Sequence, residues 1–254
     1  MDLHCLGTAG YHPSERRHTS CYFLPGDGVV LDAGTGMFRL PPLIRTPTLD
    51  ILLSHAHLDH VVGLTFLHNV LRQRPVDEIR VWGEAHSLAA IREHLFAESI
   101  FPAPIPVRWE NVTPGQELQI GSGGRILVEP RSQRHPGGSV GYRLRWPEAG
   151  EAKSLIYATD TDGDDSAAAR RWMAGADLLM HECSFRDSEQ EWAIKTGHCW
   201  PTRVAKIARD AEVRRLLLTH LGPLEPDDDP VGIAAARLIF PEVSVAADGD
   251  RIEF

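Results

Sequence analysis

The sequence predicts an α/β fold in which short strands form sheets and helices lie outside them. Short apolar segments alternate with turns rich in glycine, proline and aspartate, which is typical of strands, and other segments have the apolar spacing of a helix. No internal repeat or low-complexity linker divides the chain. Because 43% of the 254 residues are hydrophobic, the chain can bury a substantial core, and we expect one domain over residues 1–254.

Strands and helices are each expected at specific places. The predicted strands are 28–34, 49–55, 78–83, 125–130, 140–146, 154–160, 177–182 and 215–220. Helical spacing occurs at 61–73, 85–96, 167–174, 202–211 and 231–239. Pro201 and Pro230 stand where a first helical residue is expected, and Asp229 is a candidate cap of the last helix.

Composition narrows the functional classes. The formal net charge of −9 argues against a protein built around a long nucleic acid, because phosphates are usually met by a basic patch. No apolar run approaches the roughly 20 residues of a membrane span, and the first residues do not resemble a signal peptide. We therefore expect a cytoplasmic protein without a membrane partner. The four cysteines form no CxxC pair, which argues against a cysteine-based zinc site.

The segment "HAHLDH" (55–60) carries the most specific signal. His55 and His57 point the same way on an extended segment, and Asp59 and His60 follow where the chain turns into a helix. Imidazole and carboxylate groups are the usual ligands of zinc and similar ions. One ion does not easily use all four residues at this spacing, whereas two neighbouring ions do. A histidine-rich turn without metal is the alternative.

This segment matches the HxHxDH signature of the metallo-β-lactamase superfamily, and further motifs follow in that family's order. They are "LDAG" with Asp32, a lone His135 before "VGYRL", Asp160 in "ATDT" and His220 in "LTHLGP". Each of these residues lies at or just beyond the end of a predicted strand. The resemblance covers nearly the whole chain and implies the αββα sandwich, with two β-sheets face to face and helices outside.

The resemblance also implies a ligand set for two divalent ions per chain, with zinc expected first and manganese or iron as alternatives. The implied ligands are His55, His57 and His135 for the first ion, Asp59, His60 and His220 for the second, and Asp160 between them. Asp59 is also expected to be catalytic. Asp32 is expected to orient a ligand histidine or its loop from outside the ligand set.

Two departures from the β-lactamases of this fold favour phosphodiester hydrolysis. Those enzymes tend to carry a cysteine where Asp160 stands, and they commonly lack a ligand at the place of His60. Two ions about 4 Å apart suit phosphodiesters because they clamp the attacking and leaving oxygens of an in-line displacement. They also acidify a bridging water, so that hydroxide is available at pH 7.

Two further segments resemble the ribonuclease Z branch. "ADLLMHECSF" is similar to its "HEAT" segment and "TGHCWPTRVAKIA" to its "GHST" segment. A glutamate and a histidine work there as a pair near the leaving group, and they correspond to Glu182 and His198 here. Cys199 and Trp200 replace the serine and threonine of "GHST", and the sequence assigns no role to Cys183 or Cys199. The alternative is that Glu182 is an acidic surface residue at a strand end and that His198 is a loop histidine unrelated to it.

The substrate is harder to predict. Ribonuclease Z enzymes carry a flexible arm that binds tRNA, often between the third histidine motif and the bridging aspartate, where this chain has only residues 136–159, predicted as two strands and a turn. With the acidic net charge, this favours a small cyclic or linear phosphodiester over tRNA, without excluding tRNA. Arg134 is a weak candidate for contacting a substrate phosphate.

Three alternatives stay open. If the chain is not a hydrolase of small phosphodiesters, three other functions fit the sequence. They are a tRNA 3′-processing endonuclease, a thioester or lactone hydrolase of the same fold, and a metal-bound ligand-sensing module. The complete ligand set and the Glu182–His198 pair argue against a sensing module, since a binding module needs no proton donor. The sequence does not determine the oligomeric state, although proteins of the resembled family are often homodimers.

Overall fold

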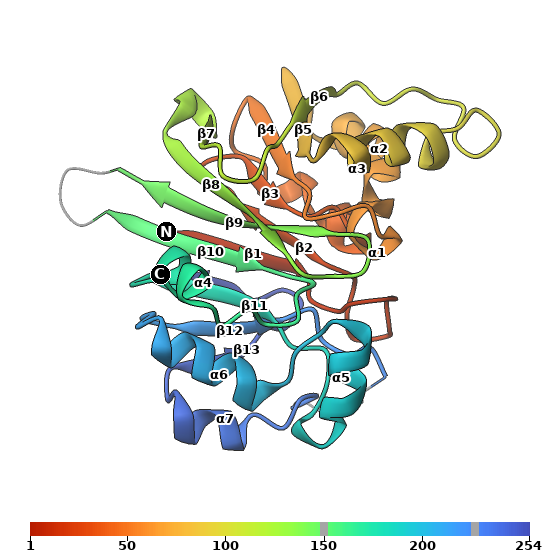
Figure 1. Cartoon of the computed structure of the whole chain (residues 1–254). Helices are drawn as coiled ribbons and strands as arrows, with labels where there is room; N and C mark the ends of the chain where they lie inside the picture. The colour runs from red at the N-terminus through yellow and green to blue at the C-terminus, as the bar shows by residue number, and fades with distance from the viewer. Residues whose placement is uncertain (148–151, 225–228) are drawn as a thin grey trace.

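Two seven-stranded sheets lie face to face in the computed structural model, which describes residues 1–147, 152–224 and 229–254 (Figure 1). The first sheet contains, in spatial order, β14 (Arg251–Glu253), β1 (Asp2–Gly7), β2 (Cys21–Leu24), β3 (Val29–Leu31), β4 (Thr48–Leu52), β5 (Glu78–Gly83) and β6 (Arg108–Asn111). The second contains β13 (Val243–Val245), β12 (Leu216–Thr219), β11 (Leu178–Glu182), β10 (Lys153–Ala158), β9 (Ser139–Trp146), β8 (Ile126–Gln133) and β7 (Leu118–Ile120).

Helices cover the outer faces of both sheets (Figure 1). Those beside the first sheet are α1 (Leu58–Val61), α2 (Leu67–Gln73) and α3 (Ala85–Ala90), the last continuing as a π-helical turn over Ile91–Leu95. Those beside the second are α4 (Ala167–Met173), α5 (Gln190–Thr196), α6 (Pro201–Asp210) and α7 (Ala234–Ile239). Short 3-10 turns occur at Thr35–Arg39, Pro41–Leu43, Val62–Phe66, Ser122–Gly124 and Asp187–Glu189. Among the described helices none is long and apolar enough to cross a membrane.

Three layers of apolar side chains hold this arrangement together. One layer fills the space between the sheets, and the other two lie between each sheet and its helices. The predicted αββα sandwich is thereby confirmed, and every strand predicted from the sequence is present. The prediction of a single domain stays a prediction.

The missed elements are mostly short or exposed. The sequence pattern did not indicate β1, β2, β6, β7, β13, β14 and α5. Most of these strands have three or four residues, too few for a periodic pattern, and β6 and β14 are largely exposed edge strands. The predicted turn between β9 and β10 falls on residues 148–151, outside the described residues.

The last helix begins later than predicted. It starts at Ala234 rather than at Pro230, because the Asp229 carboxylate accepts hydrogen bonds from the N–H groups of Gly232 and Ile233 and so stabilises a turn before the helix. Pro201, in contrast, is the first residue of α6, as expected. The helix predicted at 61–73 is a 3-10 turn followed by α2, because Val62–Phe66 adopt the tighter geometry.

Two buried tyrosines join the sheets by hydrogen bonds. Tyr157 on β10 donates its hydroxyl hydrogen to Asp32 Oδ2, which follows β3, at 2.7 Å. Tyr142 on β9 donates to the backbone carbonyl of Leu53, which follows β4, at 2.6 Å. Both side chains are fully buried, so removing either hydroxyl takes one hydrogen-bond donor away from a buried acceptor, although the Asp32 carboxylate keeps its contacts with Ser54 and His60.

We therefore predict that both phenylalanine variants lower the free energy of unfolding, but unequally. Tyr142→Phe should cost about 1 kcal/mol, and Tyr157→Phe about 2 kcal/mol because its acceptor is a charged carboxylate. Urea unfolding followed by circular dichroism measures the two values. Stability equal to that of the parent chain in both variants would contradict a role for these hydrogen bonds.

Candidate metal centre

The seven residues predicted as metal ligands lie together where strands of the two sheets end. His55 and His57 follow β4, and Asp59 and His60 lie on α1 directly after them. His135 follows β8, Asp160 follows β10 and His220 follows β12. Their ligand atoms form two groups, each with atoms within 4.8 Å of one another: His55, His57, His135 and Asp160 in one, and Asp59, His60 and His220 in the other. A third group, Asp160, His220 and His198, overlaps both.

The two oxygens of Asp160 face different histidines. Oδ2 lies 3.1 Å from His60 Nε2 and 3.3 Å from His220 Nε2. Oδ1 lies 3.5 Å from His135 Nε2 and 3.9 Å from His55 Nε2. One carboxylate therefore lies between the two histidine groups, with one oxygen directed to each, as a bridging ligand requires.

The donors of this site suit a divalent cation. His55 Nε2 and His60 Nε2 are buried and have no well-aligned hydrogen-bond partner among the described residues. Leaving such atoms unpaired is costly in a protein interior, and a cation would satisfy both. Nitrogen and carboxylate oxygen donors are also the set that zinc and related ions prefer. The residues present therefore fit a metal centre.

The charges of the site also favour a cation. Burial by itself raises the pKa of Asp160, but the surrounding histidines, His220 first, hold it well below its usual range, so that this carboxyl is ionised. Burial by itself lowers the pKa of His60, but Asp59, Asp160 and Asp32 outweigh burial and raise it well above its usual value. Three carboxylates around one buried imidazole thus create a strong demand for positive charge.

Asp32 holds the His60 ring from outside the ligand set. Its Oδ2 lies 2.7 Å from His60 Nδ1, and its carboxylate also accepts hydrogen bonds from the Ser54 N–H and hydroxyl and from the Tyr157 hydroxyl. A proton held on Nδ1 by this carboxylate leaves Nε2 as the lone-pair donor toward the site. The sequence predicted the position of Asp32 in this role, but it gave no indication of Ser54 or Tyr157.

The buried Glu182 and the partly buried His198 form a pair beside the predicted metal ligands. Glu182 ends β11, is fully buried, and accepts a hydrogen bond from His198 Nδ1 at 2.9 Å. The Cys199 N–H also donates to this carboxylate, at 3.2 Å. Burial by itself lowers the pKa of His198, but the negative charge of Glu182 and its hydrogen bond outweigh burial and raise the pKa to about 9. With Nδ1 occupied, Nε2 is the atom left for a substrate.

Ser184 connects this pair to the ligand set, and the sequence analysis missed it. Its hydroxyl oxygen lies 3.0 Å from His220 Nδ1 and 3.1 Å from Glu182 Oε2. When His220 donates its Nδ1 hydrogen to Ser184, the serine hydrogen is available to Glu182 and His220 Nε2 faces the site. Its place two residues after Glu182, inside the "HECS" segment, is the signal that identifies it.

The backbone around the site is strained. Tyr11, Asp32, Asp160 and His220 all have left-handed backbone angles, with φ between 49° and 62°. Such angles cost free energy in residues other than glycine and persist where surrounding contacts enforce them, often at functional sites. The Tyr11 N–H donates to Asp59 Oδ2 at 2.7 Å, so the loop after β1 helps to fix a predicted ligand.

Arg134, the weak candidate for contacting a phosphate, and the cysteines Cys183 and Cys199, to which the sequence assigns no role, lie in surroundings that do not favour chemistry. Arg134 is exposed, and its guanidinium Nε lies 2.9 Å from Asp162 Oδ2, so its charge is already paired. The contact of Arg134 with a substrate phosphate stays a prediction. The ion pair with Asp162 argues against it. Cys183 and Cys199 lie beside Glu182 but are fully buried, and burial raises the pKa of both thiols well above its usual value. They are therefore packing residues rather than reactive thiols.

Comparisons with known proteins agree with this fold and identify the family. Residues 28–221 match the family model of the β-lactamase superfamily domain, so the chain belongs to that superfamily. The ribonuclease Z of Bradyrhizobium sp. (strain ORS 278) is 30% identical, with 99% of each chain covered. The ribonuclease Z of Archaeoglobus fulgidus is 26% identical and covers 98% of this chain and 96% of its own.

Solved structures share the same architecture. The metallo-β-lactamase fold protein YhfI of Bacillus subtilis has a TM-score of 0.77 and 21% identity, and covers 99% of this chain and 98% of its own. The short form of human tRNase Z has a TM-score of 0.77 and 21% identity, and covers 100% of this chain and 99% of its own. The predicted superfamily and its ribonuclease Z branch are confirmed, and the chain is a metal-dependent hydrolase of this superfamily.

The absence of a side chain at Gly10 leaves room for the His220 imidazole. A Cβ atom at Gly10 would lie 2.2 Å from Cε1 and 2.6 Å from Nε2 of His220, so the imidazole would have to move. Gly10→Ala should therefore lower the number of zinc ions retained per chain. Gly26→Ala, where the nearest atom is 3.9 Å away, is the matched control and should retain the parent content. Elemental analysis after dialysis measures both, and unchanged zinc in Gly10→Ala would contradict this placement of His220.

Proposed function

We propose that the chain is a phosphodiesterase that uses two divalent ions, zinc first, with manganese or iron as alternatives. The observation that carries this proposal is the position of Asp160, whose two oxygens face two separate histidine groups, next to the hydrogen-bonded Glu182–His198 pair. The residues proposed to bind the ions are His55, His57 and His135 for the first, Asp59, His60 and His220 for the second, and Asp160 for both.

The ions supply Lewis-acid charge to the phosphoryl oxygens and lower the pKa of water, so that a nucleophile is available at neutral pH. The chain's own residues orient this chemistry. Asp32 fixes His60 through Nδ1, and Ser184 fixes His220 in the same way. Asp59, proposed as both ligand and catalytic residue, is held by the Tyr11 N–H.

We assign His198 as the proton donor to the leaving oxygen. An alkoxide is a poor leaving group unless it receives a proton as the P–O bond breaks. A protonated imidazole can deliver that proton from Nε2, and the buried Glu182 carboxylate stabilises the charged form and fixes the ring. This pair favours phosphodiesters over thioesters, because a thiolate leaves without such help more readily than an alkoxide does.

His198→Ala should depend strongly on the leaving group. We expect turnover of a diester with an alkyl leaving group to fall about 10²–10⁴-fold, which is the usual contribution of a general acid. Turnover of bis(p-nitrophenyl) phosphate should fall far less, because p-nitrophenolate leaves as an anion. Metal content should not change, since His198 is not proposed as a ligand. Glu182→Gln should give a weaker version of the same pattern. Equal losses for both substrates, or loss of metal on replacing His198, would falsify this role.

For the substrate, the curated relatives support RNA. Relatives named ribonuclease Z match nearly the full length of this chain at 25–30% identity. On this basis we propose cleavage of RNA near its 3′ end, as in pre-tRNA processing, as the first candidate. The similarity to these relatives gives more weight to tRNA as a substrate than the sequence alone did.

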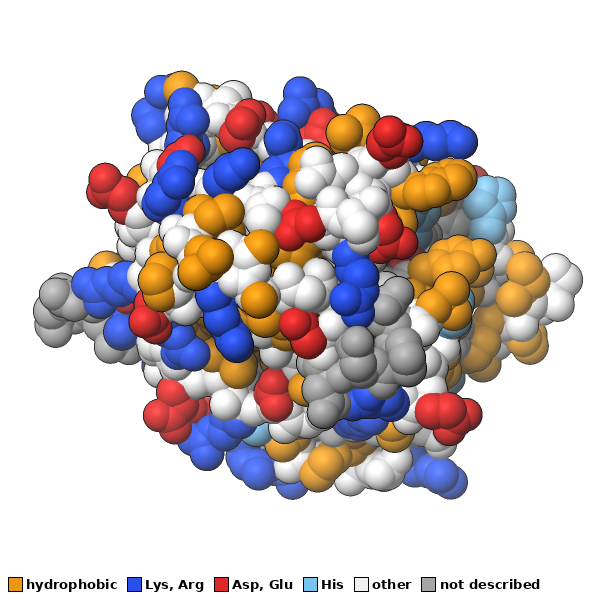
Figure 2. All heavy atoms as spheres, turned by 90° about the horizontal axis from the view of Figure 1, so that it is seen from below, with side chains coloured by type: hydrophobic (Ala, Val, Ile, Leu, Met, Phe, Trp, Pro, Cys, Tyr) orange, Lys and Arg blue, Asp and Glu red, His pale blue; other side chains and the backbone are white. Residues whose placement is uncertain are grey.

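A specific observation favours small phosphodiesters as the second candidate. Only residues 136–159 connect His135 to Asp160, and in the described part they form β9 and β10 and no added arm. The alignment with the Bradyrhizobium ribonuclease Z spans 303 positions although this chain has 254 residues, so the relative contains segments that this chain lacks. On the face shown in Figure 2, Lys and Arg side chains alternate with Asp and Glu rather than forming a basic patch.

One assay separates these candidates. The zinc-loaded protein is given pre-tRNA with a 3′ trailer, a cyclic nucleotide, bis(p-nitrophenyl) phosphate and a thioester, and kcat/KM is measured for each. Precise removal of the trailer at a higher kcat/KM than any small diester supports the RNA candidate. The reverse order supports the small diester. Hydrolysis of the thioester alone would contradict the phosphodiesterase proposal.

A further inference from the structure

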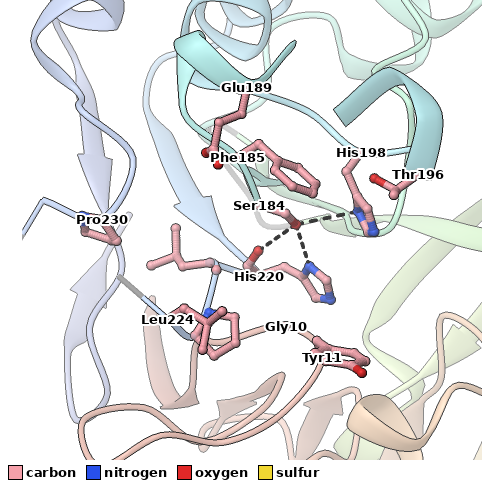
Figure 3. Close-up of a pocket in the computed structure, with 13 residues that line it drawn as sticks. Gly10, Tyr11, Ser184, Phe185, Glu189, Thr196, His198, His220, Leu224 and Pro230 are labelled. Carbon is pink, nitrogen blue, oxygen red and sulfur yellow. Dashed lines mark hydrogen bonds between the residues drawn. The ribbon is translucent and has the colours of Figure 1, made fainter. Parts of the chain in front are cut away.

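The loop between β1 and β2 reaches the candidate metal centre at two points. The Tyr11 N–H donates to Asp59 Oδ2 at 2.7 Å, and Gly10 lies so close to the His220 imidazole that a side chain there would displace it. Figure 3 shows Gly10 and Tyr11 beside the His220 imidazole, at one side of the pocket. Asp59 and His220 are both proposed as ligands of the second ion, so the site of that ion depends on where this loop lies.

The base of this loop is joined to the segment that follows β12. The Gly10 N–H donates to the Leu221 carbonyl at 3.0 Å, and the Leu221 N–H donates to the Thr8 carbonyl at 2.9 Å. The Ala9 N–H donates to the His18 carbonyl at 2.9 Å, which brings the two ends of the loop together. The loop is therefore closed at its base, and its first residues lie against the segment that begins with a proposed ligand.

A carboxylate from the other end of the chain holds both ends of this loop. Asp248 lies between β13 and β14, and its side chain is only 5% exposed. Its Oδ1 accepts a hydrogen bond from the Thr8 hydroxyl at 2.7 Å, and its Oδ2 accepts from the His18 N–H at 2.7 Å and from Arg39 Nη1 at 2.5 Å. Because Thr8 begins the loop and His18 lies near its end, one side chain fixes the two ends together.

Two arginines strengthen this contact. Arg39 also donates to the Leu6 carbonyl, at 2.5 Å, and Arg17 donates to Thr8 Oγ1 at 2.6 Å and to the Ala246 carbonyl at 2.5 Å. The buried carboxylate is thus compensated by a guanidinium and by two uncharged donors. Removing a partner from such a group leaves buried charge unpaired, so the loop stays against the C-terminal segment.

We propose that Asp248 is a positioning residue for the second ion and acts through the loop between β1 and β2. In the proposed function, on which this inference rests, Asp59 and His220 bind that ion. The hydrogen bonds that Asp248 accepts in the described part of the chain come from the loop and from Arg39, not from a proposed ligand. Without this carboxylate the ends of the loop are released, and the Tyr11 N–H loses its fixed position beside Asp59.

The two ion sites should respond differently to this change. The loop contacts Asp59 and His220, which are proposed for the second ion. The first ion is proposed to bind His55, His57 and His135, which follow β4 and β8 rather than this loop. A positioning role therefore predicts a selective loss of the second ion, whereas a general defect of the fold weakens both sites.

Zinc affinity tests this role without any turnover. Competition with a chelating dye gives the two zinc dissociation constants of the parent chain and of each variant. Asp248→Ala should weaken binding of the second ion about tenfold and leave the first unchanged, in line with the effect of residues that orient metal ligands. Glu253→Gln, which removes an exposed carboxylate from β14, is the matched control and should keep both constants of the parent chain.

Hydrogen exchange of the metal-free protein tests the loop itself. Asp248→Ala should speed exchange of the backbone N–H groups in residues 8–19 about tenfold and leave β10 unchanged, as mass spectrometry of peptides measures. A loss of stability throughout the fold speeds exchange in both segments, so the comparison separates positioning from a structural defect. Thr8→Val, which removes one of the donors to the carboxylate, gives the same tests if Asp248→Ala does not fold.

The outcomes separate this inference from the proposed function. Weaker binding of the second ion alone, with faster exchange confined to the loop, supports the positioning role of Asp248. Equal weakening of both ions, or zinc constants and exchange like those of the parent chain, overturns it while leaving the phosphodiesterase proposal intact. If the parent chain binds two ions but hydrolyses no diester, the phosphodiesterase proposal alone fails, and the zinc constants still decide the role of Asp248.

Discussion

The carboxylate of Asp160 is the group on which the geometry of the site depends. It is nearly fully buried, and each of its oxygens faces a different group of histidines. A buried carboxylate of this kind is stable only when positive charge or hydrogen-bond donors compensate it. The sandwich meets that demand by placing strand ends from both sheets around the residue. The left-handed backbones of Asp160, Asp32 and His220 show that the chain adopts strained conformations to do so.

A layer of hydrogen bonds around this centre fixes the orientation of the predicted ligands. Asp32 holds His60, Ser184 holds His220, and the Tyr11 N–H holds Asp59. Tyr157 reaches Asp32 from the opposite sheet, so the packing of the two sheets and the orientation of His60 are coupled. Glu182 connects to the same layer through Ser184, which places the proposed proton donor His198 at a fixed position relative to His220.

The sequence predicted the architecture and named ligand candidates that the structure brings close together, but it did not indicate the contacts that support them. Histidines and aspartates at the ends of apolar strands are conspicuous, and the order of their motifs indicated the sandwich. Ser54, Ser184 and Tyr157 are ordinary residues in a sequence, and only the three-dimensional approach of distant segments gives them a role. The backbone of Tyr11 and the space at Gly10 leave no pattern at all. The short strands β6 and β14 were beyond prediction because edge pairing, not periodicity, defines them.

Counting metal ions per chain tests the central claim most directly. The protein is dialysed against zinc, freed of excess ion and analysed for zinc in the parent chain and in His60→Ala, His135→Ala and His220→Ala. The proposed two-ion site predicts two zinc ions in the parent chain, fewer in each variant, and loss of diester hydrolysis with the lost ion. A single tightly bound ion in the parent chain, with full activity in His60→Ala and His220→Ala, would contradict the account.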